Sequence, residues 1–285
     1  MVFSLYTYGT SGNRGPSAPS WGSNGDAMTT KLPPAQGRPI RVVPMRGAGG
    51  LVAPAPPVRA PSAAQLTYRG GPLLTAVEVV TAFWGVAWNE ATAQATVQAL
   101  NSFFQFVVAS PYLDQLAEYG TPQVKIGRGR YAGTARVTDT APSASATDSA
   151  IQQMLEAAVA RKSLPAPTAN TVYFAFLPPG VTVVAGSERS CQAFCGYHDR
   201  SAGGLYYAVV PYPNCSGCLG NLAPLDALTS VCSHELAEAI TDPVPGQGWY
   251  NDTNGEIGDI CAWQNKKLGT YEVQLLWSNR AQACV

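Results

Sequence analysis

Residues 233–243 bring together the side chains that metal-dependent hydrolysis needs. They read Ser-His-Glu-Leu-Ala-Glu-Ala-Ile-Thr-Asp-Pro. Side chains four positions apart lie on one face of a helix, so His234 and Glu238 can bind the same ion. Asp242 comes one turn later, just before Pro243, which favours the end of the helix there. The alternative is an amphipathic helix whose acidic face is solvated.

The five residues from His234 to Glu238 resemble the zincin motif His-Glu-x-x-His, in which two ligands hold zinc and the intervening glutamate is the general base. The resemblance implies that Glu235 takes a proton from a metal-bound water molecule. The sequence departs from the motif at Glu238, where zincins have histidine, but a carboxylate is also a zinc ligand.

Two acidic residues further along the chain are candidates for a third ligand. Glu256 and Asp259 follow Glu238 by 18 and 21 residues. In gluzincins a downstream carboxylate completes the metal site and a second acid orients a histidine ligand, so we predict that one of this pair binds the metal. The alternative is a loop whose polar side chains close turns, around a calcium ion or without one.

The chain has only two histidines, and His198 is the second candidate. It lies among cysteines in 195–199, Cys-Gly-Tyr-His-Asp, where it can serve as the third ligand or as a hydrogen-bond donor to the transition state; the alternative is a structural histidine. One histidine with two or three carboxylates suits Zn²⁺, and also Mn²⁺ or Ca²⁺.

All seven cysteines lie in the last third of the chain. Their confinement to one segment of a low-charge chain favours disulfides and an oxidising compartment. The spacing of the first four also fits a zinc site of four thiolates. Two disulfides among Cys191, Cys195, Cys215 and Cys218 are the preferred interpretation, with Cys261 joined to Cys284 and Cys232 left as a buried thiol.

Periodicity predicts strands and helices in alternation, which indicates an α/β (α+β) fold. We expect a single zincin-like domain over residues 67–285, with a mixed central sheet flanked by helices and a disulfide-stabilised C-terminal third. Residues 1–66 are rich in Pro, Gly, Ser and Ala and are predicted to be an arm or a pro-segment. The predicted strands are 40–43, 77–88, 123–126, 131–137, 171–177, 205–210 and 273–277, and the predicted helices are 90–109, 149–160 and 226–240.

Composition excludes several partners. Lys plus Arg and Asp plus Glu are both 18, and no run of basic residues occurs, so no nucleic-acid partner is expected. No apolar run reaches the length of a membrane span. The first six residues do not form a signal peptide, so export requires a leader already removed or another route.

Residues 68–285 resemble the EXORDIUM/phosphate-induced protein family in its microbial branch. The motifs are Tyr-Arg-Gly-Gly-Pro at 68–72, Phe-Trp-Gly at 83–85, Cys-Gly-Tyr-His at 195–198, Thr-Asp-Pro at 241–243 with Trp249 and Tyr250, and residues 256–261. The resemblance implies secretion, an α/β fold, disulfides and a connection with cell-wall components.

Two functions follow from these features. The first is a secreted, metal-dependent, zinc-type peptidase that acts on a peptide or protein substrate. The second is a non-catalytic extracellular binding protein in which the same residues hold a structural ion. They differ in whether one coordination position of the metal is open to substrate.

Overall fold

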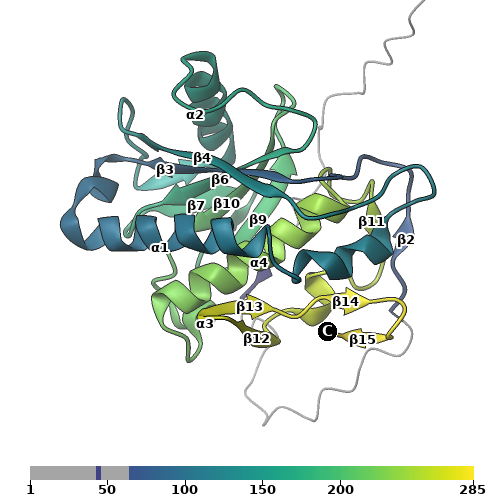
Figure 1. Cartoon of the computed structure of the whole chain (residues 1–285). Coiled ribbons are helices and arrows are strands. Elements are labelled where there is room, and N and C mark those ends of the chain that lie inside the picture. The colour runs from purple at the N-terminus through teal and green to yellow at the C-terminus, as the bar shows by residue number, and fades with distance from the viewer. Residues whose placement is uncertain (1–42, 46–63) are drawn as a thin grey trace, which may run out of the picture. The chain divides into compact units, whose positions relative to one another are not determined.

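A computed structural model describes residues 43–45 and 64–285, all within one unit, Ala35–Val285 (Figure 1). Its centre is a six-stranded mixed sheet in the order β1 (Val43–Pro44), β9 (Phe194–Arg200), β10 (Tyr206–Pro211), β6 (Thr171–Leu177), β3 (Glu78–Trp84) and β4 (Arg130–Val137). The four strands from β10 to β4 are parallel, whereas β9 runs antiparallel to β10 and β1 antiparallel to β9. The predicted mixed α/β fold is confirmed.

Helices cover both faces of the sheet. α1 (Ala91–Val107) and α4 (Pro224–Thr241) pack on one face, where β6 contributes Phe174 and Phe176. α2 (Asp148–Ala160) packs on the other, where Tyr173 and Ala175 of the same strand point. A strand covered on both faces is apolar throughout, which explains why the run 171–177 has no polar alternation.

α4 is a core helix. Pro224 begins it, Asp226 lies in its first turn, and it ends at Thr241 before the Asp242-Pro243 turn. Every residue from Ala227 to Thr241 is buried. The alternative of an amphipathic helix with a solvated acidic face is therefore wrong, because Glu235 and Glu238 lie in the interior.

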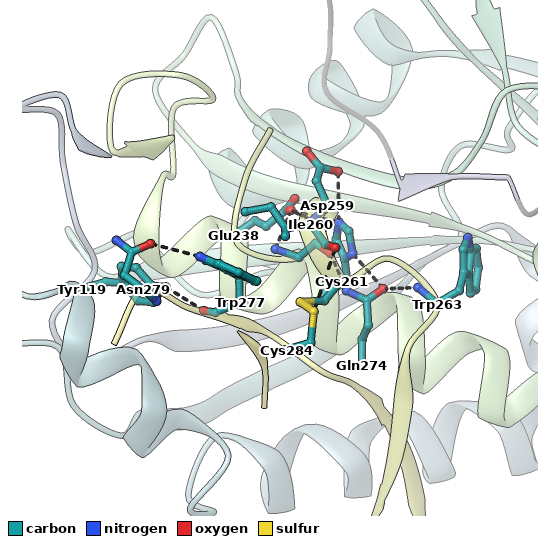
Figure 2. Close-up of a disulfide and its surroundings, with 12 residues drawn as sticks. Tyr119, Glu238, Asp259, Ile260, Cys261, Trp263, Gln274, Trp277, Asn279 and Cys284 are labelled. Carbon is teal, nitrogen blue, oxygen red and sulfur yellow. Dashed lines mark hydrogen bonds and ion pairs between the residues drawn. A yellow bond between two sulfur atoms is a disulfide. The ribbon is translucent and has the colours of Figure 1, made fainter. Parts of the chain in front are cut away.

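Three disulfides stabilise the C-terminal third, as predicted. They join Cys191 to Cys215, Cys195 to Cys218, and Cys261 to Cys284, and Cys232 is a buried free cysteine. The sulfur atoms proposed for a four-thiolate zinc site are thus all in disulfides. Figure 2 shows the third disulfide beside Asp259, Trp263 and Gln274.

Several predicted elements differ from the structure. The strand predicted at 77–88 ends at Trp84, and a 3₁₀ turn (Val86–Asn89) follows. Residues 123–126 form no ladder, and 273–277 is divided between β13 (Tyr271–Gln274) and β14 (Trp277–Ser278). β9 was not predicted, because Gly196, Asp199 and Arg200 give it a poor strand signal. Of the strand predicted at 40–43, residues 40–42 lie outside the described residues.

The remaining elements are short connections. They are β2 (Thr67–Tyr68), β5 (Ser145–Thr147), β7 (Thr182–Ala185), β8 (Glu188–Arg189), β11 (Trp249–Tyr250), β12 (Asn265–Leu268), β15 (Ala283–Cys284), α3 (Ser216–Leu219), and the 3₁₀ helices Leu113–Tyr119 and Asp259–Cys261.

Val43, Ala64 and Leu66, which belong to the predicted arm, are buried in the core. The domain boundary at residue 67 stays a prediction. Among the helices of the described residues, none combines the length and hydropathy that crossing a membrane requires.

Candidate metal centre

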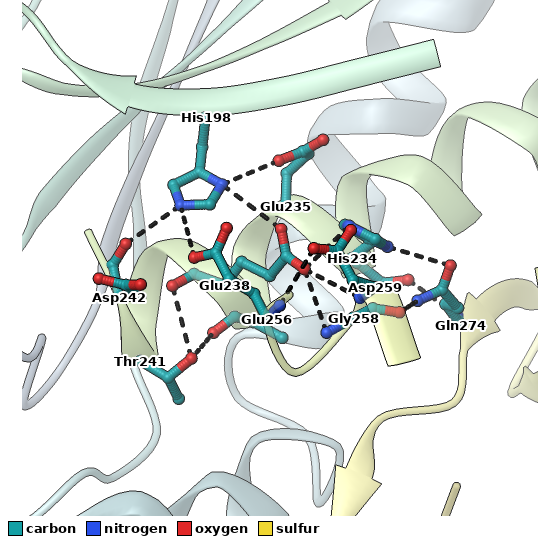
Figure 3. A network of polar contacts seen from close by, with 12 residues as sticks. His198, His234, Glu235, Glu238, Thr241, Asp242, Glu256, Gly258, Asp259 and Gln274 are labelled. Carbon is teal, nitrogen blue, oxygen red and sulfur yellow. Dashed lines mark hydrogen bonds and ion pairs between the residues drawn. The ribbon is translucent and has the colours of Figure 1, made fainter. Parts of the chain in front are cut away.

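Seven polar side chains meet between α4, β9 and the segment after β11, and we call them the buried cluster (Figure 3). Six of them are at most 3% exposed, and the seventh, Asp259, has a side-chain exposure of 17%. All candidate residues from the sequence are members. The cluster consists of His198, His234, Glu235, Glu238, Asp242, Glu256 and Asp259.

Gln274 determines how His234 faces the cluster. The Gln274 side-chain nitrogen donates to the Gly258 carbonyl at 2.9 Å, which leaves its oxygen as the acceptor, 3.1 Å from His234 Nδ1. Nδ1 is therefore a donor, and Nε2 is the nitrogen that would offer a lone pair to a metal ion once the ring is neutral. Nε2 lies 3.0 Å from Glu238 Oε1 and 3.9 Å from Asp259 Oδ1, yet it makes no hydrogen bond.

Glu238 lies at the centre of the cluster. Its Oε1 accepts hydrogen bonds from the backbone nitrogens of Gly258 and Asp259, both at 3.1 Å. A Cβ at Gly258 would lie 2.8 Å from the His234 ring and 2.9 Å from Glu238 Oε1, so only glycine allows this approach. The close backbone contact places Asp259 beside the α4 pair.

His198 is held at both nitrogens. Its Nε2 lies 3.1 Å from the Asp242 carbonyl oxygen, which can only accept, so Nε2 is the donor. Its Nδ1 faces Glu235 Oε2 at 3.1 Å and Glu238 Oε2 at 3.6 Å. Glu256 Oε1 lies 3.5 Å from Nε2. Glu235 Oε1 and both carboxylate oxygens of Glu256 are buried without a hydrogen bond.

Asp242 has a separate task. Its carboxylate accepts from the backbone nitrogens of Gly246, Gln247 and Gly248, and so closes the turn after α4. The carboxylate is thus occupied, and Asp242 contributes to the cluster mainly through its carbonyl group and its charge.

Two groups of side chains in the cluster have the geometry to hold a metal ion. They are His198, Glu235 and Glu238, and His234, Glu238 and Asp259. The cluster has five carboxyl groups and two imidazoles, so full ionisation leaves three negative charges uncompensated even with both histidines protonated. Buried charge of this kind is costly unless it is paired. A divalent cation bound to N and O donors would supply two positive charges toward this deficit.

The pKa values of the side chains in the cluster depart from their ordinary values. Burial raises the pKa of Glu256 well above its ordinary value and that of Asp259 to about 7. Burial alone would lower the pKa of His234, but the charge and hydrogen bonding of Glu238, together with the charges of Glu235 and Asp259, outweigh it and raise the pKa to about 10. The raised pKa values favour protonation of these groups, and a metal ion bound there would have to displace the protons.

Sequence reasoning missed Gln274 and its bond to His234. The only available signal was a polar residue inside the apolar stretch 273–277, and a buried glutamine in such a stretch needs partners.

Comparison of the chain with protein-family models, with curated proteins and with solved structures finds no match. The resemblance to the EXORDIUM family therefore stays a prediction, and the function is argued from the site.

Proposed function

We propose that the protein is a metal-dependent hydrolase of peptides or proteins, in which His234, Glu238 and Asp259 hold the metal. The observation that carries the proposal is the convergence of these three side chains: His234 Nε2 lies 3.0 Å from Glu238 Oε1 and 3.9 Å from Asp259 Oδ1. Asp259 is the most exposed member of the cluster, so this group lies nearest to solvent and substrate.

The donor set fits Zn²⁺, with Mn²⁺ or Ca²⁺ as alternatives. A divalent ion at this position supplies Lewis acidity and lowers the pKa of water. The chain itself provides Glu235, whose side chain projects about 100° around the helix from His234. His198 contacts Glu235 Oε2, which leaves Oε1 free to accept a proton. We assign Glu235 as the general base and His198 as the residue that positions it.

A second function is favoured by the other donor group. His198, Glu235 and Glu238 are at most 3% exposed, which suits a structural ion closed off from substrate. In that case Glu235 is a ligand, and the protein is a non-catalytic extracellular binding protein. The three disulfides are consistent with an extracellular location for either function.

The Glu235→Gln substitution separates the two functions, because it keeps the shape of the side chain and removes the proton acceptor. For the hydrolase, metal content stays at the wild-type level and turnover of a peptide library falls by roughly 10²-fold or more. The matched control is Glu188→Gln at an exposed position in β8, which should change neither.

Loss of the metal in Glu235→Gln would make Glu235 a ligand and favour the structural ion. Unchanged turnover on a substrate that the wild type cleaves would contradict the assigned base. No cleavage by either protein, with metal bound to both, would support the binding protein.

A further inference from the structure

The outer edge of β9 is covered by a very short strand of the chain itself. Val43 of β1 pairs with Gly196 and Pro44 with Phe194, and the Met45 nitrogen donates to the Ala193 carbonyl at 3.2 Å. β1 has two residues, and Pro44 has no N–H to donate to a ladder. Without this strand, β9 would present an unpaired backbone edge.

This edge lies directly beside the buried cluster. A Cβ built on Gly196, the partner of Val43, would lie 2.9 Å from Glu235 Oε1 and 2.6 Å from Val231 Cγ1. His198 follows two residues later on the same strand. A peptide that pairs with β9 in this register therefore lies directly beside the strand whose Gly196 and His198 approach Glu235.

Residues 43–45 also contact Trp263, in the segment that follows Asp259. Trp263 Nε1 donates to the Pro44 carbonyl at 2.7 Å, and the Trp263 backbone nitrogen donates to Gln274 Oε1, the atom that orients His234. Val43 is 1% exposed and lies in the hydrophobic core. The segment thus joins β9 to the loop that follows Asp259.

We propose that the outer edge of β9 is a strand-addition site for an extended peptide, and that residues 43–45 are a resident occupant that the peptide displaces. In strand addition, main-chain hydrogen bonds give affinity and side-chain pockets give preference. The site of Val43 is small, apolar and buried, so it selects a small aliphatic side chain. Naming the peptide as a substrate rests on the proposed hydrolase function, but the displacement itself requires no metal.

Displacement is favoured by the weakness of the occupant. A two-residue strand with one proline offers few ladder hydrogen bonds, and a longer peptide without proline can make more. The occupant nevertheless has the advantage of belonging to the same chain, which gives it a high effective concentration. The wild-type protein is therefore expected to bind peptides weakly, and a chain with a weakened β1 more tightly.

The test uses the full chain with Val43→Asp, which places a charge in the apolar site. The probe is a fluorescent synthetic peptide with the sequence of residues 40–47, Ile-Arg-Val-Val-Pro-Met-Arg-Gly, and its scrambled version. We expect Val43→Asp to bind the peptide at least about tenfold more tightly than the wild type does. It should bind the scrambled peptide no more tightly than the wild type does. The control is Val86→Asp, which adds the same charge at a valine that is 62% exposed.

Circular dichroism and a count of intact disulfides check that Val43→Asp is folded. If the folded variant and the wild type bind the peptide with equal affinity, the proposal is overturned. If Val43→Asp does not fold, Val43→Ala decides, because it weakens only the resident strand and leaves β9 and Trp263 unchanged for the peptide. It should raise peptide affinity in the same direction, and no increase would overturn the proposal. Tighter binding without hydrolysis of any peptide would support the edge site and contradict the proposed function instead.

Discussion

Gln274 is the residue on which the chemistry of His234 depends. Its oxygen accepts from Nδ1, and its nitrogen is tied to the Gly258 carbonyl, so the amide cannot turn over without losing both bonds. We predict that Gln274→Leu weakens Zn²⁺ binding by roughly 10- to 100-fold, the usual effect of losing a partner that orients a ligand. A competition titration with a chromophoric chelator measures it.

Gln123→Leu, at an exposed position, is the matched control and should leave the affinity unchanged. A folded Gln274→Leu protein with wild-type affinity would show that His234 does not need this bond.

Two ligands make metal binding depend on pH, because His234, whose pKa is raised to about 10, and Asp259 must each lose a proton to the metal. Burial raises the pKa of Asp259 to about 7, so this carboxyl contributes the change near neutral pH. Zn²⁺ affinity should therefore rise by at least about tenfold from pH 6 to pH 8. Isothermal titration in two buffers of different ionisation enthalpy measures the affinity and the released protons. An affinity that does not change with pH would contradict Asp259 as a ligand.

The same carboxyl affects the stability of the metal-free protein. Its pKa is higher in the fold than in the unfolded chain, so its contribution to the free energy of unfolding is present at low pH. That contribution is lost as pH rises from about 4 to about 7. Metal binds the native state and offsets the loss. The increase in melting temperature on adding Zn²⁺ should be larger at pH 8 than at pH 5, and a reversed order would contradict this sign.

At the scale of residues, spacing predicted only part of the cluster. The i, i+4 relation of His234 and Glu238 follows from helix geometry, which is local. Their contact with Asp259 depends on the close approach of Gly258 to the His234 ring, which no local pattern encodes. His198 reaches Glu235 through a strand with little intrinsic strand propensity, so its orientation became clear only from the sheet.

At the scale of elements, the Cys261–Cys284 disulfide fixes the end of the segment that carries Glu256 and Asp259 (Figure 2). It closes a loop with a sequence separation of 23 residues. In the chain-entropy model such a loop contributes about 3 kcal/mol to the free energy of unfolding. We predict that Cys261→Ala with Cys284→Ala lowers the melting temperature by roughly 6–12 °C and weakens metal binding.

Cys232→Ala is the control for this pair, because it removes a sulfur atom and leaves all three disulfides intact. A double variant with wild-type metal affinity would show that the segment is held by its backbone bonds to Glu238 alone.

The helices and strands that the sequence predicted best are those with one or both faces buried in the core. The strand 171–177 has the predicted bounds because a continuous apolar run is decided by burial. α4 was predicted as a helix, but its complete burial was not, since its acidic residues indicated a solvent face. The interior tolerates these two carboxylates because Glu235 lies beside His198 and Glu238 lies beside His234 in the cluster.

At the scale of the whole molecule, alternating strands and helices were enough to predict a mixed sheet covered by helices. The antiparallel strands β1 and β9 at the edge of the sheet were not predicted.

The cysteine pairing also acts at this scale. Thiol titration of the denatured protein should find about one free thiol, from Cys232. Three or more free thiols in freshly purified protein would contradict the disulfide set.

The proposed function depends on the buried cluster binding a divalent metal ion through His234. The most direct measurement is the metal content of the purified full chain by mass spectrometry, after equilibration with Zn²⁺ and gel filtration, for wild type and for His234→Ala. We expect about one ion per chain in the wild type and almost none in the variant. Wild-type protein with all three disulfides formed but no bound metal, or a folded variant with full metal content, would contradict it.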